Sequence, residues 1–558
     1  MTDVAALNYL WAWHLLDGLA VAGLGRVVVS PGSRSTPLAL AALRHPGLTV
    51  DMVIDERSAG FFALGAAKAG GKPVALVATS GSAVANWMPA VVEADMARVP
   101  LILLSADRPP ELQDRGANQT MEQPGLFGVH VRACHALPPA AAGSEGWLAE
   151  LGARAVATSL GPLPGPVHLN LPFREPLVPA APLAPPPRPA APRRLSSASH
   201  PDPASLGFLR DTLSSGAGAI VCGAEDLGDG FRTAVLDLAG RLKVPVLADI
   251  LSGLRFGPGA GGAVLAHPDQ VARKAPPADW VLRFGGTPVS RPLAEWLGRC
   301  SGRPQVVVSG HPRFADAPAT ATHSLHADPA ALCRSIDAAP APGSWLAGFV
   351  ARDHAAGAAA DRVCAGPEPF EGGFFRTLLP ALPDGTPVFF GNSLTVRSAD
   401  WFAGRVPRRL RPFGNRGLSG IDGNLSTAFG IAAVLGPTVA VVGDLAFLHD
   451  LNALALNAAA PLVAVVLDNG GGGIFDHLAQ ADLPEFETGW LTPQKLAVAD
   501  ACRAFALPCR PAAGIGEAVG AVLTGLAGSR AAVVNLPVSR EVGLSQVRAF
   551  HSACGEGA

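Results

Sequence analysis

The chain has 558 residues and a nearly balanced charge, with 43 lysines and arginines against 45 aspartates and glutamates. Its length predicts three or four domains, and a composition that is 49% hydrophobic and 16% charged argues against intrinsic disorder. The balanced charge argues against a nucleic-acid-binding protein, which needs excess Lys and Arg to contact phosphates. No uninterrupted apolar run approaches the roughly 20 residues of a membrane-spanning helix, so we expect no such span.

The N-terminus and the cysteines predict the cellular compartment. The opening run MTDVAALNYLWAW lacks the basic region of a secretory signal peptide. The eight cysteines are scattered and form no CxxC pair, so they predict neither a zinc site nor an iron–sulfur site. Cysteines that serve as small core residues are typical of a reducing compartment, and we expect a cytoplasmic protein.

The N-terminal part alternates strand-like and helical runs. We expect strands at the Val- and Leu-rich runs 26–34, 49–56, 73–80 and 100–109. Helices are expected between them at residues 35–45, 57–71 and 81–99. Continuous apolar strands that alternate with helices are typical of a parallel sheet covered on both faces.

The same pattern recurs further along the chain. Strand-like runs lie in a middle block at residues 218–227, 244–251, 280–286 and 305–310, and in a C-terminal block at residues 386–393, 438–447, 462–472 and 531–538. Two proline- and alanine-rich stretches, 174–203 and 337–369, are predicted to be semi-rigid connections, because proline interrupts helices and central strands. The predicted fold is therefore α/β, with three doubly wound parallel-sheet domains at residues 1–185, 186–345 and 346–558.

Polar residues follow two of the C-terminal strands, where ligands of open α/β sheets bind. Asp444 ends one apolar run, and Asn469 ends the next, 25 residues later, so one strand–helix–strand unit brings them side by side. A carboxylate, an amide oxygen and a nearby backbone carbonyl suit Mg²⁺. The run Gly470–Gly473 would let the backbone approach a phosphate closely. The alternative is a capping aspartate followed by a glycine-rich turn.

Glu56 is a second candidate, at the boundary between an apolar run and a helix. A carboxylate at the end of a buried parallel strand is costly unless it has a partner, which favours a functional role. The alternative is an acid that begins a helix and is stabilised by the helix dipole.

Together these residues resemble the thiamine diphosphate (ThDP)-dependent enzymes. Their signature is GlyAspGly followed, one strand–helix–strand unit later, by AsnAsn, and here Gly443-Asp444-Leu445 and Asp468-Asn469 each depart from it at one position. Within that superfamily, several separated runs resemble the MenD family, which makes 2-succinyl-5-enolpyruvyl-6-hydroxy-3-cyclohexene-1-carboxylate in menaquinone biosynthesis. These runs include SPGSRSTPLALA, DERSAGFFALG, TSGSAVAN, SADRPPEL, GANQTM, NRGLSGIDGNLSTA and NGGGGIF.

The resemblance implies a pyrimidine-binding (PYR) domain, a central domain and a pyrophosphate-binding (PP) domain. It implies a ThDP-dependent transferase that decarboxylates 2-oxoglutarate, adds the succinyl-semialdehyde carbanion to isochorismate in a 1,4-addition, and releases CO₂. The implied cofactors are ThDP and Mg²⁺ or Mn²⁺. The family also implies a homodimer or homotetramer whose active sites lie between PYR and PP domains of different subunits.

The resemblance also implies roles for individual residues. The implied catalytic residues are Glu56, which would bind N1′ of the ThDP pyrimidine, with Asn118 and Gln119. The implied cofactor-binding residues are Glu56, Thr79, Ser393, Leu394, Ile421, Gly443, Asp444, Leu445, Asn469 and Gly472, and the implied metal ligands are Asp444, Asn469 and Gly471. The implied substrate-binding residues are Ser33, Arg34, Arg108, Asn118, Gln119, Arg291, Arg397, Arg416, Ile474 and Phe475.

The arginines bear on the choice between related activities. Arg34, Arg108, Arg397 and Arg416 each follow an apolar strand, and guanidinium groups bind carboxylates in bidentate fashion. Two dianionic substrates need several such cations, whereas an acetolactate synthase-like decarboxylase or carboligase, the main alternative, has less use for them. A surface or interdomain salt bridge is the other explanation for each arginine.

Two further alternatives come from other functional classes. One is a catalytically silent protein of the ThDP fold, which the presence of Glu56, Asp444 and Asn469 disfavours. The other is a nicotinamide-binding protein, based on the run GAIVCGAEDLGDG, but no GxGxxG motif opens a helix there.

Overall fold

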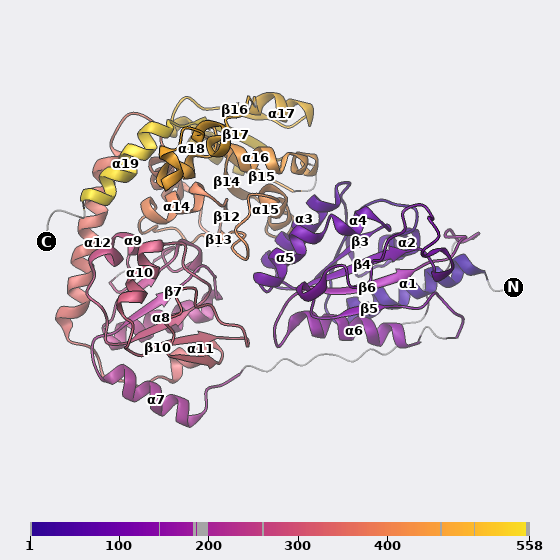
Figure 1. The fold of residues 1–558 in the computed structure, drawn as a ribbon, viewed down its shortest axis with the longest axis horizontal. Coiled ribbons are helices and arrows are strands. Elements are labelled where there is room, and N and C mark those ends of the chain that lie inside the picture. Colours follow the sequence, from indigo (N-terminus) through magenta and orange to yellow (C-terminus); the bar gives the residue numbers. More distant parts are fainter. Residues whose placement is uncertain are drawn as a thin grey trace. The chain divides into compact units, whose positions relative to one another are not determined.

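The structure is a computed structural model that describes residues 3–143, 146–181, 183, 186, 199–258, 262–457, 460–495 and 497–553. It contains three sheets whose paired strands are parallel, with helices packed on both faces, which confirms the predicted α/β class (Figure 1). The chain divides into two compact units. Unit 1 comprises Met1–Ser196, Asn415–Gly436 and His449–Leu462, and unit 2 comprises Ser197–Gly414, Pro437–Leu448 and Val463–Ala558.

The sheet of unit 1 has six strands. Their order across the sheet is β2 (Thr49–Met52), β1 (Arg26–Val29), β3 (Val74–Ala78), β4 (Leu101–Asp107), β6 (Val167–Pro172) and β5 (Cys134–Ala136). One face is covered by α1 (Val4–Val21), α2 (Thr36–Arg44) and α6 (Gly146–Leu160), which share an apolar core with the strands. On the opposite face lie α3 (Glu56–Gly70) and α5 (Met88–Met96) (Figure 1).

Two boundaries in unit 1 differ from the sequence prediction. The strand predicted at 49–56 ends at Met52, and Asp55 caps α3 by accepting a hydrogen bond of 3.1 Å from the Ser58 N–H. The helix predicted at 81–99 is two helices, α4 (Ser82–Ala85) and α5, and a proline, which lacks an N–H, occupies the first turn of α5.

One helix of unit 1 comes from far along the chain. α15 (Asn424–Leu435) packs against α3, and Figure 1 shows the two side by side. The contact depends on two glycines, because a Cβ atom on Gly65 would collide with the Thr427 carbonyl, and one on Gly430 with the Phe62 carbonyl. The approach of the two backbones fixes the loop before α15 close to α3.

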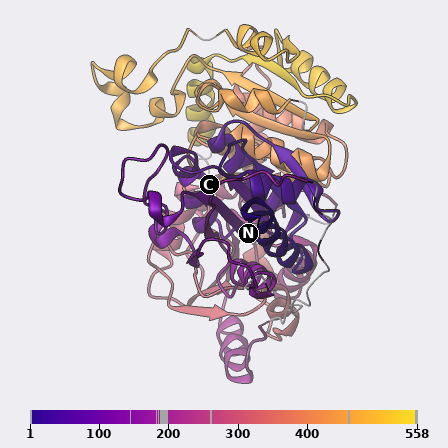
Figure 2. The same ribbon diagram turned by 90° about the vertical axis from the view of Figure 1, so that its right-hand side faces the viewer.

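Unit 2 contains the other two sheets. The middle sheet has the order β11 (His323–His326), β10 (Gln305–Ser309), β9 (Val281–Phe284), β7 (Ala219–Cys222) and β8 (Val246–Ala248). Its helices are α7 (Pro203–Ser214), α8 (Gly228–Leu242) and α11 (Pro329–Ser335) on one face, and α9 (Pro268–Lys274) and α10 (Arg291–Arg299) on the other. Figure 2 shows α7 at the outer edge of this sheet's domain.

The C-terminal sheet repeats the strand order of the first. From edge to edge it contains β13 (Arg411–Phe413), β12 (Pro387–Phe390), β14 (Thr438–Gly443), β15 (Leu462–Asp468), β17 (Ala532–Pro537) and β16 (Cys509–Pro511). The helices of this part are α13 (Glu371–Ala381), α14 (Leu394–Phe402), α16 (Asp444–His449), α17 (Val498–Ala504), α18 (Ile515–Leu526) and α19 (Arg540–Ala553).

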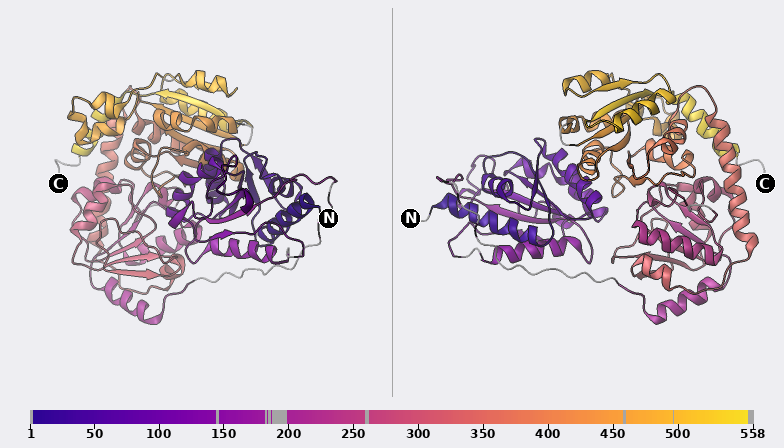
Figure 3. Two further views of the ribbon diagram at one scale, coloured as in Figure 1. Left: turned by 45° about the vertical axis from the view of Figure 1, so that its right-hand side comes forward. Right: turned by 180° about the vertical axis from the view of Figure 1, so that it is seen from behind.

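The prediction of a linker at 337–369 is wrong. Most of that stretch forms α12 (Gly343–Cys364), which contacts α9 of the middle domain and α13 and α19 of the C-terminal one (Figure 3). Its prolines lie outside the helix, and the alanine-rich segment between them favours helix formation. The other predicted linker, 174–203, falls largely outside the described residues.

Candidate functional site

Glu56 begins α3 in unit 1, and its surroundings hold the start of that helix in place. The neighbouring Arg57 donates a hydrogen bond of 2.9 Å to the His449 carbonyl, and Asn452 donates one of 2.5 Å to Asp55. Within the described residues, the Glu56 carboxyl itself takes part in no hydrogen bond or ion pair that would occupy its oxygens. The start of α3 is thus fixed in position, and it presents a carboxyl group whose oxygens can accept or donate a hydrogen bond to a ligand.

The loop that carries Arg416 and Ile421 is tied to the helices of unit 1. Glu93, which is buried, accepts hydrogen bonds from the backbone N–H groups of Gly417 at 2.9 Å and Leu418 at 2.6 Å. Lys68 lies 3.6 Å from the same carboxylate; burial lowers the pKa of Lys68, and Glu93 opposes that shift. No motif in the sequence points to Glu93, because it lies 324 residues from the loop that it holds.

The loop after β1, which carries Arg34, and the loop after β3, which carries Thr79, meet at the carboxyl ends of these two neighbouring strands. Gly32 packs so tightly against Thr79 that a Cβ atom would collide with the threonine side chain. Arg34 is 4% exposed and donates to the Phe173 carbonyl at 2.8 Å and to Glu175 at 2.7 Å. Burial and then the nearby positive charge of Arg108 lower the pKa of Arg34. The predicted residues of these loops therefore cluster, although part of the Arg34 fork is already occupied.

The loop with Asn118 and Gln119 joins this cluster. Ser80 donates to the Gln119 carbonyl at 2.8 Å, and Arg108 Nε donates to the Asn118 carbonyl at 3.0 Å. Gln119 has a φ of 54°, in the left-handed region that non-glycine residues seldom adopt. Such strain is found where surrounding contacts fix a functional loop. Beside the loop is a cavity of about 440 Å³, and Arg108 lines it.

A buried hydrogen-bond network connects these loops. Gln123 is fully buried; its Oε1 accepts from the Gly81 N–H at 2.8 Å, and its Nε2 donates to Asn170 at 2.8 Å. Asn170 in turn donates to Asp107 at 2.8 Å, and burial raises the pKa of Asp107 against the effect of that bond. The network fixes the ends of β3, β4 and β6 relative to one another. No sequence pattern indicates this network, because its members come from separate segments.

Gln123→Leu should destabilise unit 1 with little change in side-chain volume. The substitution leaves buried polar partners such as the Gly81 N–H unpaired, and each typically costs about 1–3 kcal/mol. Urea unfolding followed by circular dichroism measures this loss. Gln494→Leu is the control, because that amide is exposed and donates a hydrogen bond to the nearby Thr492 carbonyl. Equal stability of wild type and the Gln123 variant would contradict the assigned network.

In unit 2, Ser393 lies between β12 and α14. It has a φ of 67° and immediately precedes Leu394, the first residue of α14. Arg397, one turn into the helix, donates a hydrogen bond of 2.7 Å back to the Ser393 carbonyl. The strained turn and the arginine are thus held together at the carboxyl end of β12.

Asp444 and the glycine-rich run lie at the carboxyl ends of the neighbouring strands β14 and β15. Asp444 is 9% exposed, and the nearby backbone N–H groups of Leu445 and Gly471 favour its ionised form. Burial, reinforced by the nearby Asp468, raises the pKa of Asp444 to about 6. Gly471 has a φ of 137°, and a Cβ atom there would collide with the Leu491 carbonyl. The position therefore requires glycine.

Asn469 provides the test of whether a metal ion fits here. Its Oδ1 is buried and has no hydrogen-bond partner within the described residues, while its Nδ2 donates to Glu371 at 3.0 Å. The described residues contain no cluster of three His, Cys, Asp or Glu side chains, so a metal would depend on carboxylate, amide, carbonyl and cofactor oxygens. An unsatisfied amide oxygen beside the Asp444 carboxylate is the hard donor set that Mg²⁺ or Mn²⁺ prefers.

Most of the remaining predicted residues of unit 2 lie near Asp444 in the sequence, and Arg291 lies apart from them on the middle sheet's domain. Gly443 and Leu445 flank Asp444, and the Gly472 N–H donates to the Leu491 carbonyl at 2.7 Å. Ile474 and Phe475 lie in the short helix Gly473–His477 that follows. Arg291, in contrast, begins α10 with an 87% exposed side chain and pairs with Glu295, one turn along the same helix.

Comparison with known proteins identifies the family. Residues 12–126 match the family described as "Thiamine pyrophosphate enzyme, N-terminal TPP binding domain". The 2-succinyl-5-enolpyruvyl-6-hydroxy-3-cyclohexene-1-carboxylate synthase of Dechloromonas aromatica is 44% identical over 522 residues, which cover 91% of this chain and 94% of that protein. The chain belongs to this synthase family, MenD.

Two other MenD relatives match over a similar share of the chain. The synthase of Geobacillus kaustophilus is 44% identical over 521 residues, 88% of each chain, and that of Halobacterium salinarum is 40% identical over 539 residues, 91% of this chain and 92% of that protein. The predicted MenD resemblance is confirmed, and the chain is a ThDP-dependent transferase.

A solved structure supports the fold. The crystal structure of benzoylformate decarboxylase from Polynucleobacter necessarius superposes with a TM-score of 0.70 at 18% identity, over 95% of this chain and 98% of that chain. At this identity the likeness concerns the fold alone, and it confirms the predicted architecture of three α/β domains.

Proposed function

We propose that the chain catalyses the MenD reaction, in which 2-oxoglutarate is decarboxylated and its succinyl-semialdehyde unit is added to isochorismate. The observation that carries this proposal is the identity of 40–44% with MenD synthases over about nine-tenths of the chain. The site residues predicted from the family motifs lie at the carboxyl ends of the strands, where the fold binds ligands.

Glu56 is proposed to bind N1′ of the cofactor pyrimidine. The helix terminus fixes its carboxyl group, and no partner within the described residues competes for it. When bound, ThDP supplies the thiazolium carbanion that takes up and transfers the succinyl-semialdehyde unit. Ile421 and Thr79 would contact the cofactor beside Glu56, and Gln119 and Asn118 would orient the reacting groups from the strained loop.

Asp444, Asn469 and the Gly471 carbonyl are proposed to hold Mg²⁺ or Mn²⁺, which would bind the diphosphate. The support is the unsatisfied Asn469 Oδ1 and the buried Asp444 carboxylate, both of which a dication would stabilise. Ser393, Leu394, Gly443, Leu445 and Gly472 surround these ligands in the chain and would contact the same cofactor.

Different arginines are proposed to bind the carboxylates of the two substrates. We assign Arg397 to the 2-oxoglutarate side and Arg108 to isochorismate, with Ser33, Arg34, Arg416, Ile474 and Phe475 completing the contacts. Arg34 already donates hydrogen bonds to Glu175 and to the Phe173 carbonyl. We therefore propose that it contributes a fixed positive charge to the site and does not bind a substrate carboxylate with its whole guanidinium fork. Arg291 is proposed only as a peripheral contact, because its side chain is 87% exposed.

The quaternary state and location are also proposals. The MenD family resemblance supports a homodimer or homotetramer in the cytoplasm, and light scattering on the purified protein measures the subunit number. No helix among the described residues is long and apolar enough to cross a bilayer.

One assay tests the activity as a whole. Purified protein is incubated with ThDP, Mg²⁺, 2-oxoglutarate and isochorismate, and the product is followed by mass spectrometry. We expect the succinyl adduct with its enolpyruvyl group retained. Turnover of pyruvate in place of 2-oxoglutarate, with no adduct from isochorismate, would favour the acetolactate synthase-like alternative.

Glu56→Gln should keep the fold and lose turnover by about 10²–10⁴-fold, the usual worth of a positioned acid or base. Steady-state kinetics at saturating ThDP measures the loss. Glu541→Gln, an exposed acid in the first turn of α19, controls for a helix-dipole effect. Activity within a few-fold of wild type would remove Glu56 from the proposed role.

Asp444→Ala should weaken cofactor binding because the metal loses its carboxylate ligand. Removal of one partner from a buried charge pair costs about 2–5 kcal/mol, and excess Mg²⁺ should recover binding only in part. Isothermal titration calorimetry with ThDP at several Mg²⁺ concentrations measures the change. Unaltered affinity in a folded variant would show that the metal lies elsewhere.

Single Ala substitutions of Arg108 and Arg397 should separate the two substrates. Arg397→Ala should raise the KM for 2-oxoglutarate, and Arg108→Ala the KM for isochorismate, each through loss of a charge-assisted contact worth about 2–5 kcal/mol. Lysine should rescue little, because it lacks the planar fork. Decarboxylation measured without isochorismate isolates the first half-reaction; equal losses of both halves in both variants would argue for structural clamps instead.

A further inference from the structure

Unit 2 contains a buried carboxylate to which neither the sequence motifs nor the proposed function assigns a role. Glu371, the first residue of α13, is 4% exposed. Within the described residues it forms no ion pair with a basic side chain. Burial of an uncompensated carboxylate is costly, so its retention calls for a compensating purpose.

Within the part of the chain that the structure describes, the side chain of Glu371 has one hydrogen-bond partner, and it is a residue proposed as a metal ligand. Asn469 Nδ2 donates to Glu371 Oε1 at 3.0 Å, across 98 residues of sequence. A Cβ atom on Gly473 would lie only 2.8 Å from the same nitrogen, so the glycine leaves room for the amide. The Nδ2 end is thus paired and closely packed, while the buried Oδ1 has no hydrogen-bond partner within the described residues.

The chemistry of the two groups fixes the direction of the amide. An ionised carboxylate only accepts hydrogen bonds, whereas an amide has a donor end and an acceptor end. Glu371 therefore selects the rotamer in which Nδ2 points toward α13 and Oδ1 points away. A reversed amide would place two oxygens together and present N–H groups, which repel a cation, where the metal ligand should be.

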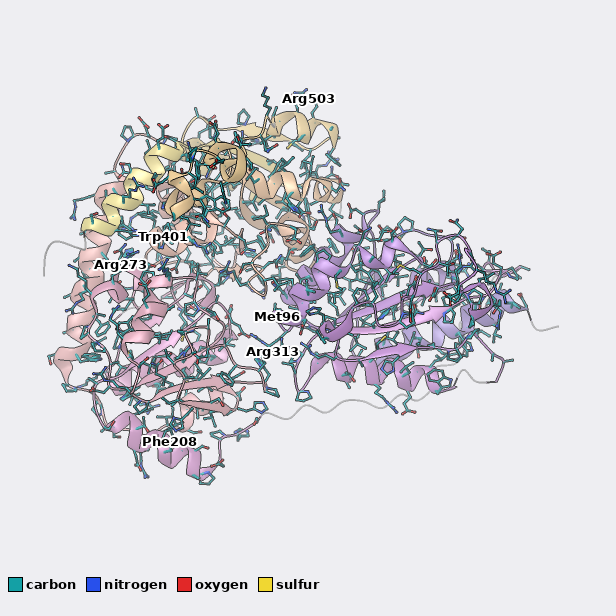
Figure 4. The ribbon with its side chains drawn as sticks, in the orientation of Figure 1. Met96, Phe208, Arg273, Arg313, Trp401 and Arg503 are labelled. Carbon is teal, nitrogen blue, oxygen red and sulfur yellow. The ribbon has the colours of Figure 1, made fainter. Side chains whose placement is uncertain are left out.

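Residues of α19 and of the short helix Gly473–His477 lie close to the Glu371 carboxylate. A Cβ atom on Gly543 in α19 would lie 2.9 Å from Glu371 Oε2, so the glycine makes room for the carboxylate. Burial raises the pKa of Glu371, the Asn469 hydrogen bond opposes that shift, and the nearby Asp476 adds to it. Asp476 is itself paired with Arg540 at 3.0 Å. Further along α19, the ring of His551 packs edge to face against the ring of Trp401 in α14, labelled in Figure 4, with their centroids 5.3 Å apart.

We infer that Glu371 is a positioning residue that orients the Asn469 amide so that Oδ1 faces the metal ion. The inference rests on the metal site put forward under the proposed function. It also accounts for the buried negative charge, because a dication bound through Asn469 compensates Glu371 without touching it.

The test compares two substitutions that differ only in whether an acceptor for Asn469 remains. Glu371→Gln keeps an amide oxygen that accepts from Nδ2, whereas Glu371→Leu removes it at similar size. Full-length protein with ThDP is titrated with Mn²⁺, and free Mn²⁺ is measured by electron paramagnetic resonance. Loss of such a supporting contact typically weakens metal affinity by about 10–100-fold, so we expect that loss in the Leu variant and less than about fivefold in the Gln variant.

Controls separate this role from a structural one and from failure of the metal site itself. Glu517→Leu alters an exposed acid in the first turn of α18 and should leave the Mn²⁺ affinity unchanged. Thermal unfolding in EDTA reports the fold of each variant without metal. Absence of Mn²⁺ binding by wild type overturns the proposed metal site. Normal wild-type binding with an unimpaired, folded Leu variant overturns the orienting role alone, as does an equal loss in the Gln and Leu variants.

Discussion

The strand order of the parallel sheets determines where polar residues of this chain can meet. In the first sheet, β1 lies between β2 and β3, and in the C-terminal sheet β12 lies between β13 and β14. The chain therefore adds the next strand on one side of β1 or β12 and the following strand on the other side. The strand order reverses between β1 and β3 and between β12 and β14, and in open α/β sheets ligands bind at the carboxyl ends of the strands at such points. Arg34 and Thr79 lie beside one such point, and Ser393 and Asp444 beside the other. Hydrophobic burial builds the sheets, and their topology leaves these edges for chemistry.

The sequence predicted most of the buried strands, because each is a short apolar run. It missed the edge strands β5, β11, β13 and β16, which are short or partly exposed, and it missed the buried β6, in which His168 and Asn170 interrupt the apolar run. It misplaced α12, where flanking prolines concealed a helix, and it joined α4 to α5 across a proline that interrupts them. Motif residues such as Glu56, Asp444 and Asn469 were identifiable because they end such runs and match family patterns. Their supporting residues were not: Glu93 acts across 324 residues and Glu371 across 98, and no local pattern encodes a contact at that separation.

Several polar groups in the site remain unsatisfied within the described residues, and each has a thermodynamic meaning. Asn469 Oδ1 and Arg34 Nε lack partners, and burial raises the pKa of Asp444 to about 6. Buried groups of this kind make the protein without ligands less stable than a fully paired protein would be. Ligands that pair with these groups bind the folded state and stabilise it. Cofactor and metal should therefore raise the unfolding temperature in a concentration-dependent way.

The packing of α15 against α3 also affects the order in which the chain can fold during synthesis. The helix that α3 needs, with its close glycine contacts at Gly65 and Gly430, is encoded far downstream of the sheet it supports. A ribosome must therefore translate most of the chain before the first unit receives its last helix, and until then the apolar face of α3 is exposed. Nascent chains that stall before residue 415 should accordingly depend on chaperones, and an N-terminal fragment expressed alone should aggregate more readily than the whole protein.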